Sequence, residues 1–156
     1  MSVEMCKPFN PIIGETFEAY WPDDTKIYAE HISHHPPITS FLVEHQSGLY
    51  RFHGSFEYTA KLTDFGNSAL GKQVGKSYIE FRDGSKISFE YPFMKIGGLL
   101  FGKRTVKFTG KVEFNDDKNN IFAELSFNSE GGMFKKRQGN VDEFSGIINH
   151  GAVRAR

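Results

Sequence analysis

The residues best suited to binding chemistry are two neighbouring histidines followed by two prolines, in the run Ser33-His34-His35-Pro36-Pro37. Neighbouring side chains on a strand normally face opposite ways, but proline fixes φ at about −65° and holds the preceding residue extended. A bend at this point would turn both imidazoles toward one ligand. Because a protonated imidazole donates two hydrogen bonds, the pair suits a phosphate group.

Two other interpretations of these rings stay open. The His34 and His35 rings could simply satisfy the end of a strand. Alternatively, His31 could join them to give three metal-binding nitrogens within a short stretch of chain. A zinc site also needs tetrahedral reach and usually a fourth ligand, and Cys6 is remote in sequence. We therefore expect no metal and no other cofactor.

A second candidate segment lies upstream, between residues 7 and 18. Lys7 and Asn10 stand three residues apart in a loop that Pro8 and Pro11 constrain. Lys7 supplies a point charge, and Asn10 supplies two directed N–H donors. Together with the two histidines, they would make a site for a multiply charged phosphate. Taken singly, Lys7 is equally compatible with an ordinary surface lysine.

Catalytic patterns are weak in this sequence. Ser33 is next to His34, but adjacent residues rarely reach the geometry of a nucleophile and its base, and the sequence has no Gly-x-Ser-x-Gly elbow. Glu15 and Glu18 could form a carboxylate pair for glycoside chemistry. A β-barrel hydrolase or a glycan-active enzyme that uses these two carboxylates is therefore the alternative to a binding protein.

Strands must position these residues, because apolar side chains recur mainly with a period of two. The segment 49–62 is the longest such strand. Asp83-Gly84 predicts a hairpin with a type I′ turn, whose two central residues both need positive φ. The segments 105–114 and 121–127 are expected to pair as neighbours. The other expected strands cover residues 17–21, 26–32, 39–45, 77–82 and 86–91.

The fold class that follows is all-β and antiparallel, with few or no long helices. No window of ten or more residues has a convincing helical repeat, and many strands without helical cover must close at least partly into a barrel or pack as a sandwich. The chain contains 16 Phe. They favour either an aromatic-rich core or a barrel whose apolar interior is a ligand cavity.

Composition narrows the class of protein. The chain has 156 residues, with 19 Lys and Arg against 19 Asp and Glu, which predicts one domain and argues against a nucleic-acid partner. Its weakly basic second half is compatible with an anionic membrane surface. Cys6 is the only cysteine, so a reducing compartment fits. No apolar run approaches the roughly 20 residues of a membrane span.

Two motifs resemble the oxysterol-binding protein-related lipid-transfer family. The family string Glu-x-x-Ser-His-His-Pro-Pro occurs here as residues 30–37, and its upstream pattern Lys-Pro-x-Asn-Pro-x-x-Gly-Glu occurs as residues 7–15. Weaker similarity continues through Tyr91-Pro92, Leu100-Phe101-Gly102, Gly110 and Leu125-Ser126-Phe127. The resemblance thus covers the chain from Lys7 to about Ile148.

The resemblance implies an incomplete antiparallel β-barrel around an apolar tunnel. In such a protein one lipid is sheltered while phosphatidylinositol 4-phosphate or a sterol is exchanged between membranes. The residues that would bind the headgroup phosphates are Lys7, Asn10, His34 and His35. The implied partners are membrane lipids, and the counter-ligand could be sterol, phosphatidylserine or neither. The implied location is cytoplasmic, peripherally at organelle membranes or membrane contact sites, and no oligomeric state is implied.

The chain also departs from the family pattern. Family ligand domains carry an N-terminal lid before the first motif, and they continue into a helical region that adds charged contacts to the phosphate. We therefore expect residues 1–156 to be a single, truncated lipid-binding domain without that lid and without the C-terminal helical part. Such an open barrel would expose apolar surface.

Overall fold

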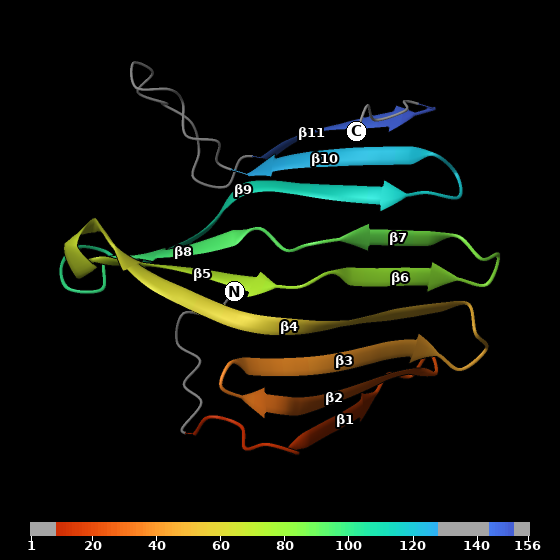
Figure 1. Ribbon diagram of the computed structural model, residues 1–156, viewed down its shortest axis with the longest axis horizontal. Helices are drawn as coiled ribbons and strands as arrows, with labels where there is room; N and C mark the ends of the chain where they lie inside the picture. The colour runs from red at the N-terminus through yellow and green to blue at the C-terminus, as the bar shows by residue number, and fades with distance from the viewer. Residues whose placement is uncertain (1–8, 128–143, 152–156) are drawn as a thin grey trace.

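One antiparallel sheet makes up the fold in the computed structural model, which describes residues 9–127 and 144–151 (Figure 1). The described residues form eleven strands and one three-residue 3₁₀ segment, η1 (Asp64–Gly66). The strands are β1 (Thr16–Tyr20), β2 (Thr25–His34), β3 (Pro37–His45), β4 (Tyr50–Thr63), β5 (Ser68–Val74), β6 (Ser77–Phe81), β7 (Lys86–Phe89), β8 (Phe93–Gly97), β9 (Thr105–Asp116), β10 (Ile121–Phe127) and β11 (Phe144–His150).

The strand order is β1-β2-β3-β4-β5-β8-β9-β10-β11, with β6 and β7 inserted between β4 and β9. The long strand β4 organises this arrangement. It pairs with β3 on one side, and on the other side it pairs first with β6 and then with β5. The all-β, antiparallel prediction is confirmed. Within the described ranges the strand path runs from β1 to β11 without closing.

Period-two alternation gives the sheet one apolar face. Cross-strand pairs place Phe41 of β3 beside Phe52 and Phe56 of β4, with ring centroids 4.9 Å and 5.0 Å away respectively. Phe89 of β7 continues the aromatic row and lies 5.0 Å from Phe114 of β9. Aromatic pairs at these separations add to the free energy of apolar burial. The many phenylalanines of the sequence are therefore gathered mainly on one side of the sheet.

The opposite face carries a ladder of alternating charge. Strand register aligns Lys26, Glu44, Arg51, Glu80 and Lys86 across five neighbouring strands. Ion pairs join Arg51 Nε to Glu44 Oε2 at 3.6 Å and Lys86 Nζ to Glu80 Oε1 at 2.8 Å. Opposite charges directly across from one another favour this register, and a slip by one residue would break every pair.

The apolar face has little cover. Phe56 and Val112 are the only buried hydrophobic residues among those described, whereas the rest of the aromatic row is half-buried or exposed. No helix in the described segments is long and apolar enough to cross a membrane. A wide apolar surface thus remains available on one side of the sheet.

The turn predicted at Asp83-Gly84 exists as a hairpin between β6 and β7, but its predicted type is wrong. Gly84 has a φ of 79°, whereas Asp83 does not have positive φ. The Asp83 carboxylate accepts hydrogen bonds from the Ser85 amide at 2.9 Å and from the Ser85 hydroxyl at 2.6 Å. This local Asx-type turn holds Asp83 outside the left-handed region, so one glycine completes a longer loop.

Candidate functional site

The candidate site begins with an irregularity in β2. The pairing with β3 aligns His31 with Thr39, Ser33 with Ile38 and His34 with Pro37, so the register shifts between His31 and Ser33. Because a bulge adds one residue to the strand, His31 and His34 point to the same face although they are three residues apart. Their ring centroids lie 5.8 Å apart, with the ring planes at 80°.

His35 extends this row of rings. It lies in the turn between β2 and β3, and its ring centroid is 4.7 Å from that of His34. Both His34 and His35 are exposed, so both rings can meet a ligand. The chain bends here as the two prolines suggested, and it brings the two imidazoles side by side.

The upstream loop is fixed against the same part of β2. The Gly14 amide donates to the His31 carbonyl at 2.8 Å, and the His31 amide donates to the Glu15 carbonyl at 3.0 Å. The loop is also closed on itself, because the Glu15 carboxylate accepts a hydrogen bond from the Ile12 amide at 3.0 Å. Backbone hydrogen bonds thus join the two sequence motifs into one local structure.

Asn10 and His34 meet at a hollow of about 470 Å³, which Pro11, Ile12 and Ile13 also line. The structure therefore brings together Asn10 and His34, with His35 adjacent through its ring contact. Lys7 lies outside the described residues. The arrangement offers amide and imidazole N–H donors beside apolar side chains, which suits a phosphate attached to a lipid.

His31 is the site residue whose position sequence reasoning missed. Its side chain is only 4% exposed, its Nδ1 lies 3.3 Å from the Thr39 hydroxyl, and its buried Nε2 has no hydrogen-bond partner. The sequence raised His31 only as a metal ligand. In the described part of the chain, no group of three His, Cys, Asp or Glu residues is placed to hold a metal ion.

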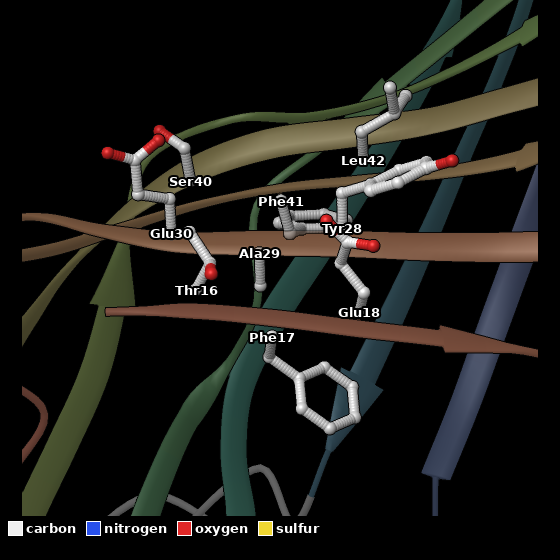
Figure 2. A pocket seen from close by; sticks show the side chains of 9 residues that line it. All are labelled: Thr16, Phe17, Glu18, Tyr28, Ala29, Glu30, Ser40, Phe41 and Leu42. Carbon is white, nitrogen blue, oxygen red and sulfur yellow. The ribbon is translucent and has the colours of Figure 1, made fainter. Parts of the chain in front are cut away.

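A second hollow, of about 270 Å³, crosses the first three strands (Figure 2). Figure 2 shows Tyr28 and Leu42 on one side of the sheet and Phe17 pointing to the other. The Glu18 and Glu30 carboxylates are among its lining residues, so this hollow is poorly suited to an anionic phosphate. The first hollow is the better candidate for a headgroup.

The two carboxylates of the enzyme alternative belong to different local structures. Glu15 completes the turn that begins at Ile12, whereas Glu18 lies within β1, opposite Tyr28 of β2. A glycosidase needs two carboxyl groups that flank one scissile bond. The structure gives these two glutamates separate surroundings and does not favour that alternative.

Fold and site together define an open all-β domain that presents amide and imidazole donors at the edge of an apolar sheet face. The Oxysterol-binding protein family matches residues 1–154, and the chain belongs to this family.

Relatives agree with this assignment along most of the chain. Oxysterol-binding protein 9 of Dictyostelium discoideum is 38% identical over 153 residues, which are 95% of this chain and 35% of the relative. Human oxysterol-binding protein-related protein 5 is 34% identical over 151 residues, which are 93% of this chain and 17% of the relative. The chain thus spans about a third or less of the length of these relatives.

Two solved structures are similar to this chain in fold. The Osh1 ORD domain in complex with cholesterol aligns with a TM-score of 0.77 at 26% identity, covering 93% of this chain and 33% of that one. The Osh3 ORD in complex with PI(4)P from Saccharomyces cerevisiae aligns with a TM-score of 0.71 at 26% identity, covering 84% and 34%.

Proposed function

We propose that this chain binds phosphatidylinositol 4-phosphate and takes part in the transfer of lipid between membranes, with sterol as a second candidate ligand. Lys7, Asn10, His34 and His35 hold the headgroup phosphates. The observation that carries the proposal is the meeting of Asn10 and His34 at one hollow, with His35 adjacent. Binding rather than catalysis is the activity of the site.

Similarity to solved lipid complexes supports the choice of ligands. The aligned Osh3 ORD was solved with PI(4)P, and the aligned Osh1 ORD domain with cholesterol. A phosphate needs several directed donors, which the Asn10 amide and the two imidazoles provide. The Lys7 ammonium adds a point charge to this set.

The apolar face supports binding of the rest of the lipid. Its aromatic row, which includes Phe41, Phe52 and Phe89, is open to an apolar ligand because the described residues do not cover it with a second layer. Each acyl CH₂ that leaves water against such a surface contributes about 0.8 kcal/mol. Acyl chains and the sterol skeleton compete for the same kind of surface.

The domain and its cellular place are part of the same proposal. We infer that residues 1–156 form the central, motif-bearing part of a lipid-binding domain to which a lid and a helical region contribute elsewhere. The share of the solved ORD chains that this chain covers, 33% and 34%, supports that view. The site then works in the cytoplasm, peripherally at organelle membranes.

The test compares two double variants of the 156-residue chain. His34→Ala with His35→Ala removes the proposed phosphate ligands. The matched control, His45→Ala with His53→Ala, removes two imidazoles that contact Ser47 and Glu80 instead. Thermal unfolding is followed with soluble short-chain phosphatidylinositol 4-phosphate, and with phosphatidylinositol as the ligand control.

We expect the native chain and the control variant to be stabilised by the phosphorylated lipid alone, by about 2.7 kcal/mol at a hundred times Kd. The His34/His35 variant should lose that shift and still take up sterol. Equal loss of sterol and phosphoinositide binding in this variant would show a structural role for the pair and contradict the proposed site.

A further inference from the structure

The connection between β4 and β5 projects beyond the histidine turn. The last β3 residue paired with β4 is Ile38, opposite Glu57, yet β4 continues to Thr63, which adds about 20 Å of strand. At its end, Phe65 is fully exposed and has a φ of 53° and a ψ of 36°. The left-handed region disfavours a bulky side chain, so the fold holds this phenylalanine outward against its backbone preference.

A second loop is attached to this end of the sheet by one asparagine. The Asn67 side-chain oxygen accepts hydrogen bonds from the Leu100 and Phe101 amides, each at 3.0 Å. The Asn67 carbonyl accepts a third from the Leu99 amide at 3.0 Å. Leu100 and Phe101 are nevertheless 69% and 70% exposed, so these bonds fix the loop without burying its apolar side chains.

Four exposed residues thus share this end of the molecule, and we call them the apolar tip. They come from β4, η1 and the β8–β9 loop, which lie together at one end of the sheet (Figure 1). The members of the apolar tip are Leu62, Phe65, Leu100 and Phe101.

The chain around the apolar tip is basic, although the whole chain has a net charge of zero. Asp64 is the single acidic residue of segments 61–67 and 95–107, and its carboxylate pairs with Lys95 Nζ at 2.8 Å. Five basic residues against one acidic residue leave positive charge in excess around the exposed apolar groups, and the excess comes from segment 95–107. The basic residues of these segments are Lys61, Lys95, Lys103, Arg104 and Lys107.

We propose that the apolar tip docks the protein on a membrane by inserting into the headgroup and acyl boundary of a bilayer that contains anionic lipid. Exposed Phe and Leu side chains gain free energy in that boundary, and the surrounding Lys and Arg residues are attracted to anionic headgroups. A narrow projecting end suits insertion into a fluid surface. This docking mode rests on the proposed function, because a lipid ligand has to be reached from a membrane.

The topology places the apolar tip at the same end of the strands as the candidate phosphate site. His34 is the last residue of β2, and Thr63 is the last residue of β4. These two strands run in the same direction, so both residues lie toward the same end of the strands (Figure 1). Trp21 precedes the first residue of β2 and therefore lies at the opposite end of the strands. Docking through the tip would turn the histidine turn, and not Trp21, toward the bilayer.

The single tryptophan makes the orientation measurable. Vesicles of phosphatidylcholine and phosphatidylserine, without phosphoinositide, are prepared with brominated acyl chains that quench indole fluorescence on contact. In the Trp21→Phe, Phe65→Trp double variant the indole reports on the apolar tip. In the native chain the indole of Trp21 reports on the opposite end of the strands. We expect quenching and a blue shift for the indole at position 65 and no change for Trp21. Quenching of Trp21 alone, or of neither indole, would overturn the proposal.

Loss variants test the two parts of the surface separately. Phe65→Ser with Leu100→Ser and Phe101→Ser should weaken vesicle binding at least about tenfold, since three large apolar groups leave the boundary. The control variant Leu49→Ser with Phe81→Ser removes exposed apolar groups at the opposite end of the strands. It should bind as the native chain does, and an equal loss in this control would overturn the assignment of the surface.

Charge is tested by Lys103→Gln with Arg104→Gln. Each lost charge should weaken binding to anionic vesicles about fivefold and leave the weak binding to pure phosphatidylcholine unchanged. The control is Lys26→Gln with Arg82→Gln, which changes two basic residues at the opposite end of the strands. Equal effects of the two charge pairs would show long-range attraction without docking at the tip and would contradict the proposal.

Failure of the docking mode and failure of the lipid site are distinguishable. The vesicles lack phosphoinositide, so His34→Ala with His35→Ala should keep vesicle binding while losing the shift with soluble phosphatidylinositol 4-phosphate. A chain that binds the soluble lipid but not the vesicles would refute the apolar tip alone. A chain that binds vesicles through the tip but not the soluble lipid would support docking and refute the headgroup site.

Discussion

His31 and His34 face the same side of β2, with ring centroids 5.8 Å apart, because the strand carries one extra residue between them. In a regular strand, residues three apart point to opposite faces. The bulge therefore places a buried imidazole beside an exposed one. His31 anchors the backbone of the upstream loop through its own amide and carbonyl, and His34 meets that loop at the hollow.

Replacing His31 with Leu tests the state of its buried ring. A buried nitrogen without a partner costs about 1–3 kcal/mol, whereas the Nδ1 contact with the Thr39 hydroxyl, at 3.3 Å, contributes about 0.5–1.5 kcal/mol. We expect His31→Leu to leave the free energy of unfolding unchanged or to raise it by up to about 2 kcal/mol, as measured by urea unfolding at constant m-value.

Thr39→Val is the matched variant, because it removes the Thr39 hydroxyl that contacts Nδ1 of His31 and keeps the imidazole. It should destabilise the lipid-free chain by about 1 kcal/mol. A strong destabilisation by His31→Leu would show that the ring makes a contact that apolar packing cannot replace.

Asn67→Ala tests the attachment of the β8–β9 loop. The substitution removes the side-chain acceptor of the Leu100 and Phe101 amides, both at 3.0 Å. Because water can replace these bonds at an exposed site, we expect a loss of about 1–2 kcal/mol and faster hydrogen exchange at the two amides. Asn67→Asp keeps an acceptor and should keep slow exchange. Unchanged exchange in Asn67→Ala would mean that the loop is held by other contacts.

The expected strands with strong alternation were confirmed, whereas β5, β8 and β11 were missed. In β5, the residues on the apolar face are Ala69, Gly71 and Gln73, so no apolar alternation is visible. Its place is decided by its neighbours, because Gly71 pairs with Ala60 of β4 and Met94 of β8. Strand propensity reflects such cross-strand packing more than the segment itself.

The candidate site was predictable to the extent that it is local. The turn of His34 and His35 follows from the two prolines that come after them. The burial of His31 depends on the bulge, and a bulge depends on how two strands pair, which no local pattern in this sequence indicates. The contact of Asn10 with the same hollow depends on the long-range bonds of Gly14 and Glu15 to His31.

Acid stability tests the charge ladder through Glu80. Its hydrogen bond from Lys86, and then that from His53, lower the pKa of the Glu80 carboxyl below its ordinary value of 4.5. A lowered pKa in the folded state means that the stabilisation is complete above about pH 4.5 and is lost as the pH falls through the lower folded value. The group is partly exposed, so the contribution is at most about 0.5 kcal/mol.

We therefore expect Glu80→Gln to lower the free energy of unfolding slightly at pH 7 and to make its decline toward pH 3 shallower. Urea unfolding across that range measures both effects. The control is Glu57→Gln, which changes a β4 carboxylate on the same face of the sheet as Glu80 and should retain the native decline. An identical pH dependence in the native chain and in Glu80→Gln would rule out this ion pair as a source of acid sensitivity.

Gly75→Ala tests the point at which the second partner of β4 changes from β5 to β6. Gly75 follows Val74, which pairs with Glu57, and precedes the strand whose Ser77 pairs with Gly54. Its φ is +135°, and an added Cβ would collide with the Ser55 carbonyl oxygen. Because that neighbour is backbone within the sheet, the clash cannot be relieved by a side-chain rotation.

We expect Gly75→Ala to lower the free energy of unfolding by at least about 2 kcal/mol, as measured by urea unfolding. Gly48→Ala is the control, since Gly48 has a φ of +70° and open space around the added atom. It should cost only about 1 kcal/mol, the backbone preference alone. Equal effects of the two substitutions would mean that the β4 backbone at Ser55 moves to accommodate the added atom. The connection between β5 and β6 would then tolerate a wider turn.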